Sequence, residues 1–170
     1  MEADGAPALR NELSFYTIVP DEFVIGSFDT SNASYVNPQW NASNYPDVKE
    51  SQFPVILDTG TTMTMLPTGL LLAYFRQIPG GVRQEQGLYW ALCDAKLPKF
   101  GVKIGGKTFY LRDEDIMYQE VRGGRRGEYC ELGLVDLAPD GPFILGESFL
   151  NAVVTVFDVG ASEIRIYERK

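Results

Sequence analysis

Short runs of β-branched and aromatic residues recur along this 170-residue chain, and glycine, proline, asparagine or aspartate separates one run from the next. Runs of this length, bounded by turn residues, are typical of strands. They occupy residues 13–19, 23–28, 53–58, 88–93, 100–104, 107–111, 115–121, 129–134, 152–158 and 163–168, with one more in the FILG segment that begins at Phe143. Many short strands and little helix predict an all-β domain.

Two segments predict helix instead. Residues 68–78, TGLLLAYFRQI, form an apolar stretch that Thr68 can cap after Pro67. The Pro-Gly-Gly sequence at 79–81 ends this stretch, because proline and glycine stop helices. A second, short helix is predicted near 147–151. We therefore expect one main helix and one short helix within an all-β fold.

The length of the chain suits one domain with a single core, and its 45% hydrophobic content is that of a globular protein. Residues 1–12 are small and polar, which predicts a loose N-terminal segment before a domain over 13–170. Inside that domain, residues 29–52 are rich in asparagine, serine, proline and aspartate. They predict a long loop with room for one short strand.

Charge and composition exclude several classes of function. The formal net charge is −8, which argues against nucleic acid as a partner, because phosphate binding needs a basic face. The chain has no histidine, and this excludes Ser-His-Asp and Cys-His catalysis and every histidine metal site. We expect no metal and no membrane span, since no apolar run approaches the roughly 20 residues that a membrane helix needs.

The two cysteines, Cys93 and Cys130, are compatible with one disulfide or with two free buried thiols. A disulfide between them would contribute roughly 3–4 kcal/mol in the chain-entropy model and would favour an oxidising compartment. The sequons at Asn32 and Asn41 point to the same compartment, as possible N-glycosylation sites. We therefore expect a secreted protein or one of the vacuolar or lysosomal lumen. The start, MEADGAPALR, has no apolar core of a signal peptide, so we expect such a leader to lie outside this sequence.

The most informative segment is FPVILDTGTTMTMLP, residues 53–67, in which an apolar strand ends in Asp58. A carboxylate at the end of a buried strand is costly unless it is hydrogen-bonded. The threonine hydroxyls and the backbone N–H groups of a turn at Gly60 can supply those bonds. A carboxylate held in this way suits acid–base chemistry in which two carboxylates share a proton. An Asp-Thr-Gly turn without chemistry is the alternative.

Seven segments, in order, extend this signal along the chain. They are Ile56-Leu57-Asp58-Thr59-Gly60-Thr61, Leu66-Pro67, Leu97-Pro98, Ile104-Gly105-Gly106, Ile144-Leu145-Gly146, Phe149-Leu150 and Val156-Phe157-Asp158. In order and approximate spacing they resemble the C-terminal lobe of pepsin-like aspartic proteases. The resemblance covers residues 53–168 and is weaker over 13–35. It implies a closed, double-psi-type β-barrel lobe, mostly antiparallel.

The resemblance also implies roles for the residues of the loop. Asp58 would be one of two catalytic carboxylates, and Thr59 would brace the pair through a contact between lobes. Gly60 would let the turn close and the substrate backbone approach. Thr61 and Thr62 would bond the carboxylate or the bound peptide.

Outside the loop, the resemblance implies that Ile144, Leu145 and Gly146 support it from below. Cys93 and Cys130 fall at the position of the family's disulfide in this lobe. The implied reaction is hydrolysis of a peptide by activated water at acid pH, with no cofactor. The implied substrate is an extended peptide with apolar side chains beside the cut.

The second carboxylate is missing from this pattern. The segment most similar to Asp-Thr-Gly elsewhere in the chain is Asp29-Thr30-Ser31, which lacks the glycine. We therefore interpret Asp29 as structural. Nothing in the sequence corresponds to the family's flap.

Three hypotheses follow for the whole protein. The chain is one lobe of a two-lobed endopeptidase whose N-terminal lobe lies elsewhere, or a single-lobe homodimeric protease, or a pepsin-fold binding or inhibitor module. A homodimer would self-associate, and a binding module would keep its affinity after Asp58→Asn.

Overall fold

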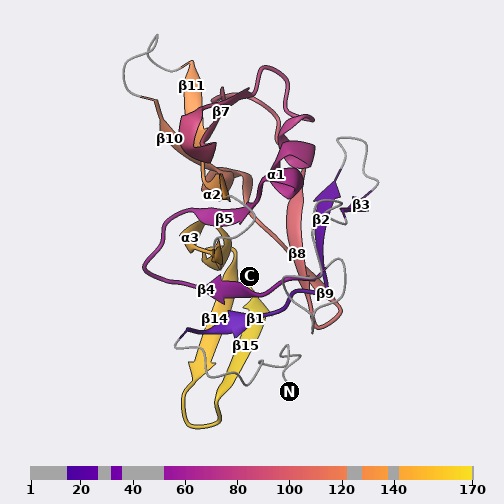
Figure 1. Ribbon diagram of the computed structural model, residues 1–170, viewed down its shortest axis with the longest axis vertical. Helices are drawn as coiled ribbons and strands as arrows, with labels where there is room; N and C mark the ends of the chain where they lie inside the picture. Colours follow the sequence, from indigo (N-terminus) through magenta and orange to yellow (C-terminus); the bar gives the residue numbers. More distant parts are fainter. Residues whose placement is uncertain (1–14, 27–31, 36–51, 122–127, 138–141, 170) are drawn as a thin grey trace.

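The computed structural model of this chain describes residues 15–26, 32–35, 52–121, 128–137 and 142–169 (Figure 1). Its strands are β1 Thr17–Ile18, β2 Glu22–Gly26, β3 Asn32–Tyr35, β4 Val55–Leu57, β5 Thr64–Pro67, β6 Val82–Arg83, β7 Tyr89–Leu92, β8 Phe100–Ile104, β9 Lys107–Tyr110, β10 Met117–Glu120, β11 Tyr129–Leu132, β12 Leu134–Leu137, β13 Phe143–Leu145, β14 Val153–Asp158 and β15 Glu163–Glu168. The helices are α1 Thr68–Phe75, α2 Asp113–Ile116 and α3 Glu147–Leu150, with a 3-10 turn at Glu85–Gly87. The all-β prediction is confirmed.

The described strands form four sheets with the orders β1-β4-β13-β5-β12, β10-β11-β7-β6, β3-β2-β8-β9 and β14-β15. Most neighbouring pairs are antiparallel, as expected, but β4 and β13 are parallel, and so are β5 and β12. Among the described strands the sheets stay open and do not close into one barrel, because each sheet ends in strands that have no further neighbour.

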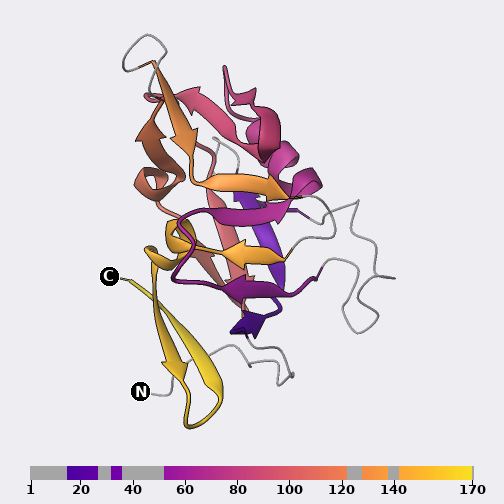
Figure 2. The same cartoon turned by 60° about the vertical axis from the view of Figure 1, so that its left-hand side comes forward.

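The five-stranded sheet positions the candidate site. Strand β13 lies between β4 and β5, so the two strands that flank the Asp58 loop do not pair with each other (Figure 2). The register sets Leu145 opposite Leu57 and Ile144 opposite both Ile56 and Met65. The loop therefore crosses from β4 to β5 over the end of β13.

Helix α1 is shorter than predicted and begins differently. It ends at Phe75, after which Gln77 and Ile78 continue as turns through bonds to the carbonyls of Tyr74 and Phe75. Thr68 is the first helical residue and not the cap; the cap position is Pro67, which has no side-chain bond to offer. The reason is that β5 runs into α1 without a loop, so no residue is free to cap it.

Several predicted boundaries were wrong, and four elements were not predicted. Residues Asp115 and Ile116, assigned to a strand, belong to α2. Strands β5, β6 and β12 and helix α2 have two to four residues each, too few for a periodic pattern to appear in the sequence. Strand β3 is the short strand expected within 29–52. The predicted loose segment at 1–12 lies outside the described residues.

The core is built around aromatic rings that come from distant parts of the chain. Phe53 stacks on Phe23, with ring centroids 5.1 Å apart, and meets Phe143 edge-on at 4.9 Å. Tyr74 of α1 contacts Phe100 at 5.2 Å and donates its hydroxyl to the carbonyl of Pro98 at 3.0 Å. These contacts join β2, β8, β13 and α1 into one core.

Cys93 and Cys130 form a disulfide, so the alternative of free thiols is excluded. The bond joins the end of β7 to its neighbour β11 in the same sheet. Within the described residues no helix is long and apolar enough to cross a membrane.

We expect the double substitution Cys93→Ser/Cys130→Ser to lower the free energy of unfolding by about 4 kcal/mol, because the bond closes a loop that the unfolded chain would otherwise leave free. Urea denaturation of the purified chain measures this difference. The reduced wild-type chain is the control and should lose a similar amount. A loss below about 1 kcal/mol in both would contradict the expectation.

Candidate active site

Asp58 follows β4 directly, and each of its carboxylate oxygens accepts a hydrogen bond. The amide of Gly60 donates to Oδ1 at 2.8 Å and the hydroxyl of Thr61 donates to Oδ2 at 2.6 Å. The amide of Asp58 donates to the carbonyl of Leu145 at 3.2 Å, which ties the start of the loop to β13. The predicted turn therefore holds its carboxylate by two neutral donors from its own loop.

These donors lower the pKa of Asp58. The Thr61 hydroxyl has the larger effect, the Gly60 amide adds to it, and partial burial opposes both. A hydrogen bond to a carboxylate favours its charged form, so the group stays ionised in more acidic solution than an ordinary aspartate. Because the folded-state pKa is the lower one, the bonds stabilise the fold above the unfolded pKa, and this contribution is lost as the pH falls through the folded pKa.

The tip of the loop faces solvent. Thr59 and Gly60 are exposed, while Thr61 and Thr62 are partly buried. The carbonyls of Thr61 and Thr62 accept bonds from the amides of Glu147 and Ser148, at 2.8 and 3.0 Å. The loop is therefore fastened at its base and open at its tip, where a second polypeptide or a peptide can approach.

The structure places Ile144, Leu145 and Gly146 against this loop. Leu145 is fully buried beside Leu57. A Cβ atom at Gly146 would lie 2.4 Å from the carbonyl oxygens of both Thr61 and Met63, so only glycine fits under the loop. The supporting role expected of these residues stays a prediction.

Three residues near the loop were missed by sequence reasoning: Thr64, Gly133 and Ser148. Thr64 and Ser148 are buried, and the Ser148 hydroxyl donates to the carbonyl of Gly133 at 2.8 Å. A threonine between two methionines, in an otherwise apolar run, was the one signal that could have pointed to Thr64. Gly133 and Ser148 have no such signal, because their neighbours in space come from other parts of the chain.

Among the described residues, the pKa of Asp58 is shifted by the Thr61 hydroxyl, the Gly60 amide and burial. A second carboxylate is not among these causes. Asp29 lies outside the described residues, as does Asn41. Asn32 begins β3 opposite Gly26. Within the part of the chain that the structure describes, no group of three or more His, Cys, Asp or Glu side chains is arranged to hold a metal ion.

Comparison with known proteins shows the family of the chain that carries this site. A family model described as "Eukaryotic aspartyl protease" matches residues 29–168. The chain belongs to the eukaryotic aspartyl protease family. Asp58, on its Asp-Thr-Gly-Thr loop, lies within the matched range.

Two curated relatives and one solved structure illustrate the match. Penicillopepsin-1 of Talaromyces stipitatus is 36% identical over 109 residues, covering 64% of this chain and 27% of that protein. Aspartic endopeptidase PEP1 of Trichophyton verrucosum is 28% identical over 145 residues, covering 84% of this chain and 35% of that protein. The crystal structure of an aspartic proteinase from Irpex lacteus has a TM-score of 0.72 at 20% identity, and supports the fold.

This alignment covers 100% of this chain, whereas it covers only 48% of the Irpex lacteus protein. The chain thus spans about a third of the two curated relatives and about half of the aligned structure.

We expect Thr61→Val to raise the pKa of the Asp58 carboxyl toward its ordinary value, because the substitution removes the donor with the largest effect on that carboxylate. Carbon-13 NMR of the side-chain carboxyl across a pH titration measures it. Thr59→Val is the matched control at an exposed neighbour and should leave the pKa in place. Equal pKa values in the wild type and Thr61→Val would contradict the hydrogen bond.

We expect Gly146→Ala to destabilise the chain by about 2–3 kcal/mol, because its methyl group would collide with two backbone carbonyls that cannot move independently of the loop. Gly160→Ala is the control, since a Cβ there would meet its nearest neighbour, Asp158 Oδ1, at an ordinary 3.6 Å. Thermal unfolding of both variants gives the comparison. A Gly146→Ala variant as stable as the control would show that the loop has room for a side chain.

Proposed function

We propose that this chain is the C-terminal lobe of an aspartic endopeptidase and supplies Asp58 as one of its two catalytic carboxylates. The observation that carries the proposal is the carboxylate of Asp58, held by Gly60 and Thr61 on a loop whose tip is exposed. A buried structural aspartate would need no open tip. Membership of the aspartyl protease family supplies the chemistry that uses such a group.

The proposed reaction needs a second carboxylate, which the other lobe provides. One carboxylate takes a proton from water while the water oxygen bonds to the carbonyl carbon of the peptide. The other carboxyl group gives its proton to the carbonyl oxygen. The tetrahedral gem-diol intermediate then collapses. The C–N bond breaks as the carboxyl that took the water's proton gives it to the leaving nitrogen. The other carboxylate takes the proton of one hydroxyl as the carbonyl re-forms, which restores the starting pair. No covalent bond to the enzyme forms, and no cofactor enters the reaction.

In this scheme the donors on Asp58 favour its ionised form. Two carboxylates in contact cannot both ionise freely, so the pair would share one proton and titrate as a unit. The neutral donors of Gly60 and Thr61 offset part of that repulsion. Activity should therefore require an acidic medium in which the pair holds one proton.

An exposed apolar surface supports the proposal of a missing lobe. Val154 and Val156 lie on the outer face of β14, 49% and 40% exposed, in a hairpin that extends away from the other sheets (Figures 1 and 2). Tyr16 is 44% exposed and packs on Phe157 of the same hairpin, with centroids 4.6 Å apart. The carbonyl of Tyr16 accepts the amide of Leu57 at 2.8 Å, so Tyr16 adjoins the strand that ends in Asp58. Val154 and Val156 lie on the face of β14 opposite to Phe157, because side chains alternate along a strand.

We propose that the first lobe covers these exposed apolar side chains, since exposed apolar surface marks interaction sites. The aligned aspartic proteinase is about twice as long as this chain, which leaves room for a second lobe of similar size. The substrate would be an extended peptide that meets the exposed tip at Thr59 and Gly60. We propose that residues 13–170 form the lobe, with 1–12 outside it, in a protein that is secreted or held in a vacuolar or lysosomal lumen.

The test compares the 170-residue chain with a fusion in which the first lobe of a related aspartic endopeptidase precedes it. Hydrolysis of a peptide with apolar residues beside the cut is measured at about pH 3–5, with and without a statine inhibitor. We expect the chain alone to be a silent monomer and the fusion to be active. Asp58→Asn should reduce the activity of the fusion by at least about 1000-fold, since it removes one of two essential carboxylates.

Other outcomes identify the alternatives. Asp58-dependent activity of the chain alone, in a particle of twice its mass, would mean that two copies supply the two acids. A folded fusion that binds the inhibitor equally well with and without Asp58→Asn, and cleaves nothing, would mean a binding module. Circular dichroism of the fusion shows whether it is folded, so that a silent fusion can be interpreted.

A further inference from the structure

Two buried hydroxyl groups meet beneath the candidate active site. Thr64 begins β5 and is 0% exposed, and Ser148 lies in α3 and is 4% exposed. Their hydroxyl oxygens are 2.8 Å apart, although the residues are 84 positions apart in the sequence. Hydroxyl groups buried in an apolar core are costly unless all their bonds are made.

The pair is fully bonded by backbone groups. The Ser148 hydroxyl accepts the amide of Thr64 at 3.0 Å and donates to the carbonyl of Gly133 at 2.8 Å. The Thr64 hydroxyl accepts the amide of Gly146 at 3.3 Å. A Cβ at Gly133 would lie 2.6 Å from the carbonyl oxygen of Asp115, so the backbone that receives the Ser148 bond is itself packed tightly. Two side chains thus join β5, α3 and the start of β12.

The same two elements hold the loop of Asp58. The first amides of α3, those of Glu147 and Ser148, donate to the carbonyls of Thr61 and Thr62. Thr61 in turn donates its hydroxyl to Asp58 at 2.6 Å. Any movement of α3 away from β5 would therefore pull on the residue that orients the carboxylate.

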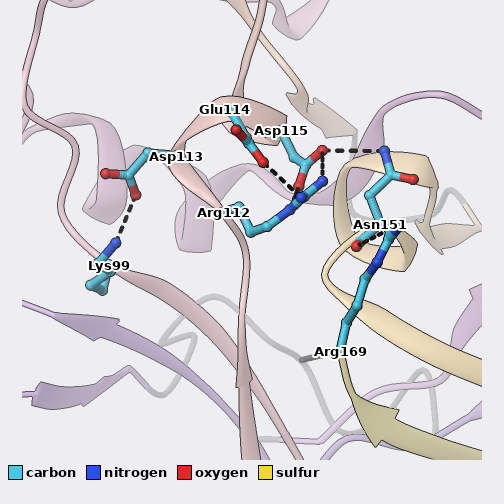
Figure 3. A network of polar contacts seen from close by, with 7 residues as sticks. All are labelled: Lys99, Arg112, Asp113, Glu114, Asp115, Asn151 and Arg169. Carbon is cyan, nitrogen blue, oxygen red and sulfur yellow. Dashed lines mark hydrogen bonds and ion pairs between the residues drawn. The ribbon is translucent and has the colours of Figure 1, made fainter.

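Helix α3 is also fixed at its far end (Figure 3). Asn151 donates from its side chain to Asp115 of α2 at 3.2 Å, and its carbonyl accepts Arg169 at 3.0 Å. Arg112 donates to both carboxylate oxygens of Asp115 and orients that acceptor. With the far end of α3 fastened, the Thr64–Ser148 pair is the side-chain contact that joins the loop side of the helix to β5.

We propose that Thr64 and Ser148 are positioning residues that orient the Asp58 carboxylate by locking α3 to β5 beneath its loop. A catalytic role for Asp58 rests on the proposed function. The positioning of its carboxylate rests on the hydrogen bonds alone. A pair that merely fills the core would contribute to stability without affecting the loop.

The test is a pair of isosteric substitutions in the 170-residue chain, Thr64→Val and Thr155→Val. Thr64→Val removes the acceptor of the Gly146 amide. Thr155 of β14 is the matched control, because its buried hydroxyl oxygen has no hydrogen-bond partner among the residues that the structure describes. Hydrogen exchange of the Glu147 and Ser148 amides and the NMR titration of the Asp58 carboxyl are measured in both variants.

We expect Thr64→Val to speed exchange of the Glu147 and Ser148 amides by about tenfold or more, while the Leu111 amide, bonded to Phe100 in another sheet, keeps its rate. The pKa of Asp58 should rise in Thr64→Val and stay in place in Thr155→Val. Thr64→Ser keeps the hydroxyl and should restore both values. The titratable side chains on the elements against the loop, Glu147 and Tyr16, are the same in every variant.

Two results would overturn the proposal. One is faster exchange at all three amides together, which would show global destabilisation alone. The other is an unchanged pKa of Asp58 in a folded Thr64→Val variant. Neither readout requires hydrolysis, so failure of the proposed function, a fusion without activity, can be told apart from failure of the positioning role.

Discussion

Strand β13 lies between β4 and β5, and this insertion fixes the path of the Asp58 loop. It is parallel to β4 and antiparallel to β5, and its residues come from 76 or more positions further along the chain than either strand. Because β13 separates them, the connection between β4 and β5 must arch over its end. That arch carries Asp58, and the residue beneath it, Gly146, has no space for a side chain. The position of Asp58 at the base of an exposed loop tip is thus a result of strand order.

A second aspartate in the same sheet shows how differently a structural carboxylate is treated. Asp136 of β12 is 5% exposed and accepts two bonds from Arg83 and one, at 2.7 Å, from the Tyr89 hydroxyl. Burial and this carboxylate raise the pKa of Tyr89, so the phenol remains protonated and continues to donate. A cation neutralises Asp136, whereas Asp58 is held by neutral donors and reaches solvent. The second arrangement leaves the negative charge available to a partner.

The hairpin of β14 and β15 carries the apolar side chains that the proposed first lobe would cover. Its buried face packs on the core through Val153 and Ile164, while Val154 and Val156 face outward. A strand that is apolar on both faces normally lies between two layers. Within the described residues the second layer is absent, and the relatives of this chain are two to four times longer than the matched part. Under the proposed function, a first lobe would account for the unmatched length of the relatives and would cover this face.

The local features of this protein could be predicted from its sequence. Alternating short strands, the apolar stretch of α1, the Gly-Gly hairpin and the Asp-Thr-Gly-Thr turn depend on residues close together in the chain, where propensity and spacing are readable. Two cysteines and a family resemblance were enough to predict the disulfide. Tertiary structure alone decided the order β4-β13-β5, the short elements α2 and β12, and the meeting of Thr64 with Ser148. These features rest on contacts between segments far apart in sequence, and a hydrogen bond across 84 residues leaves no periodic trace in either segment.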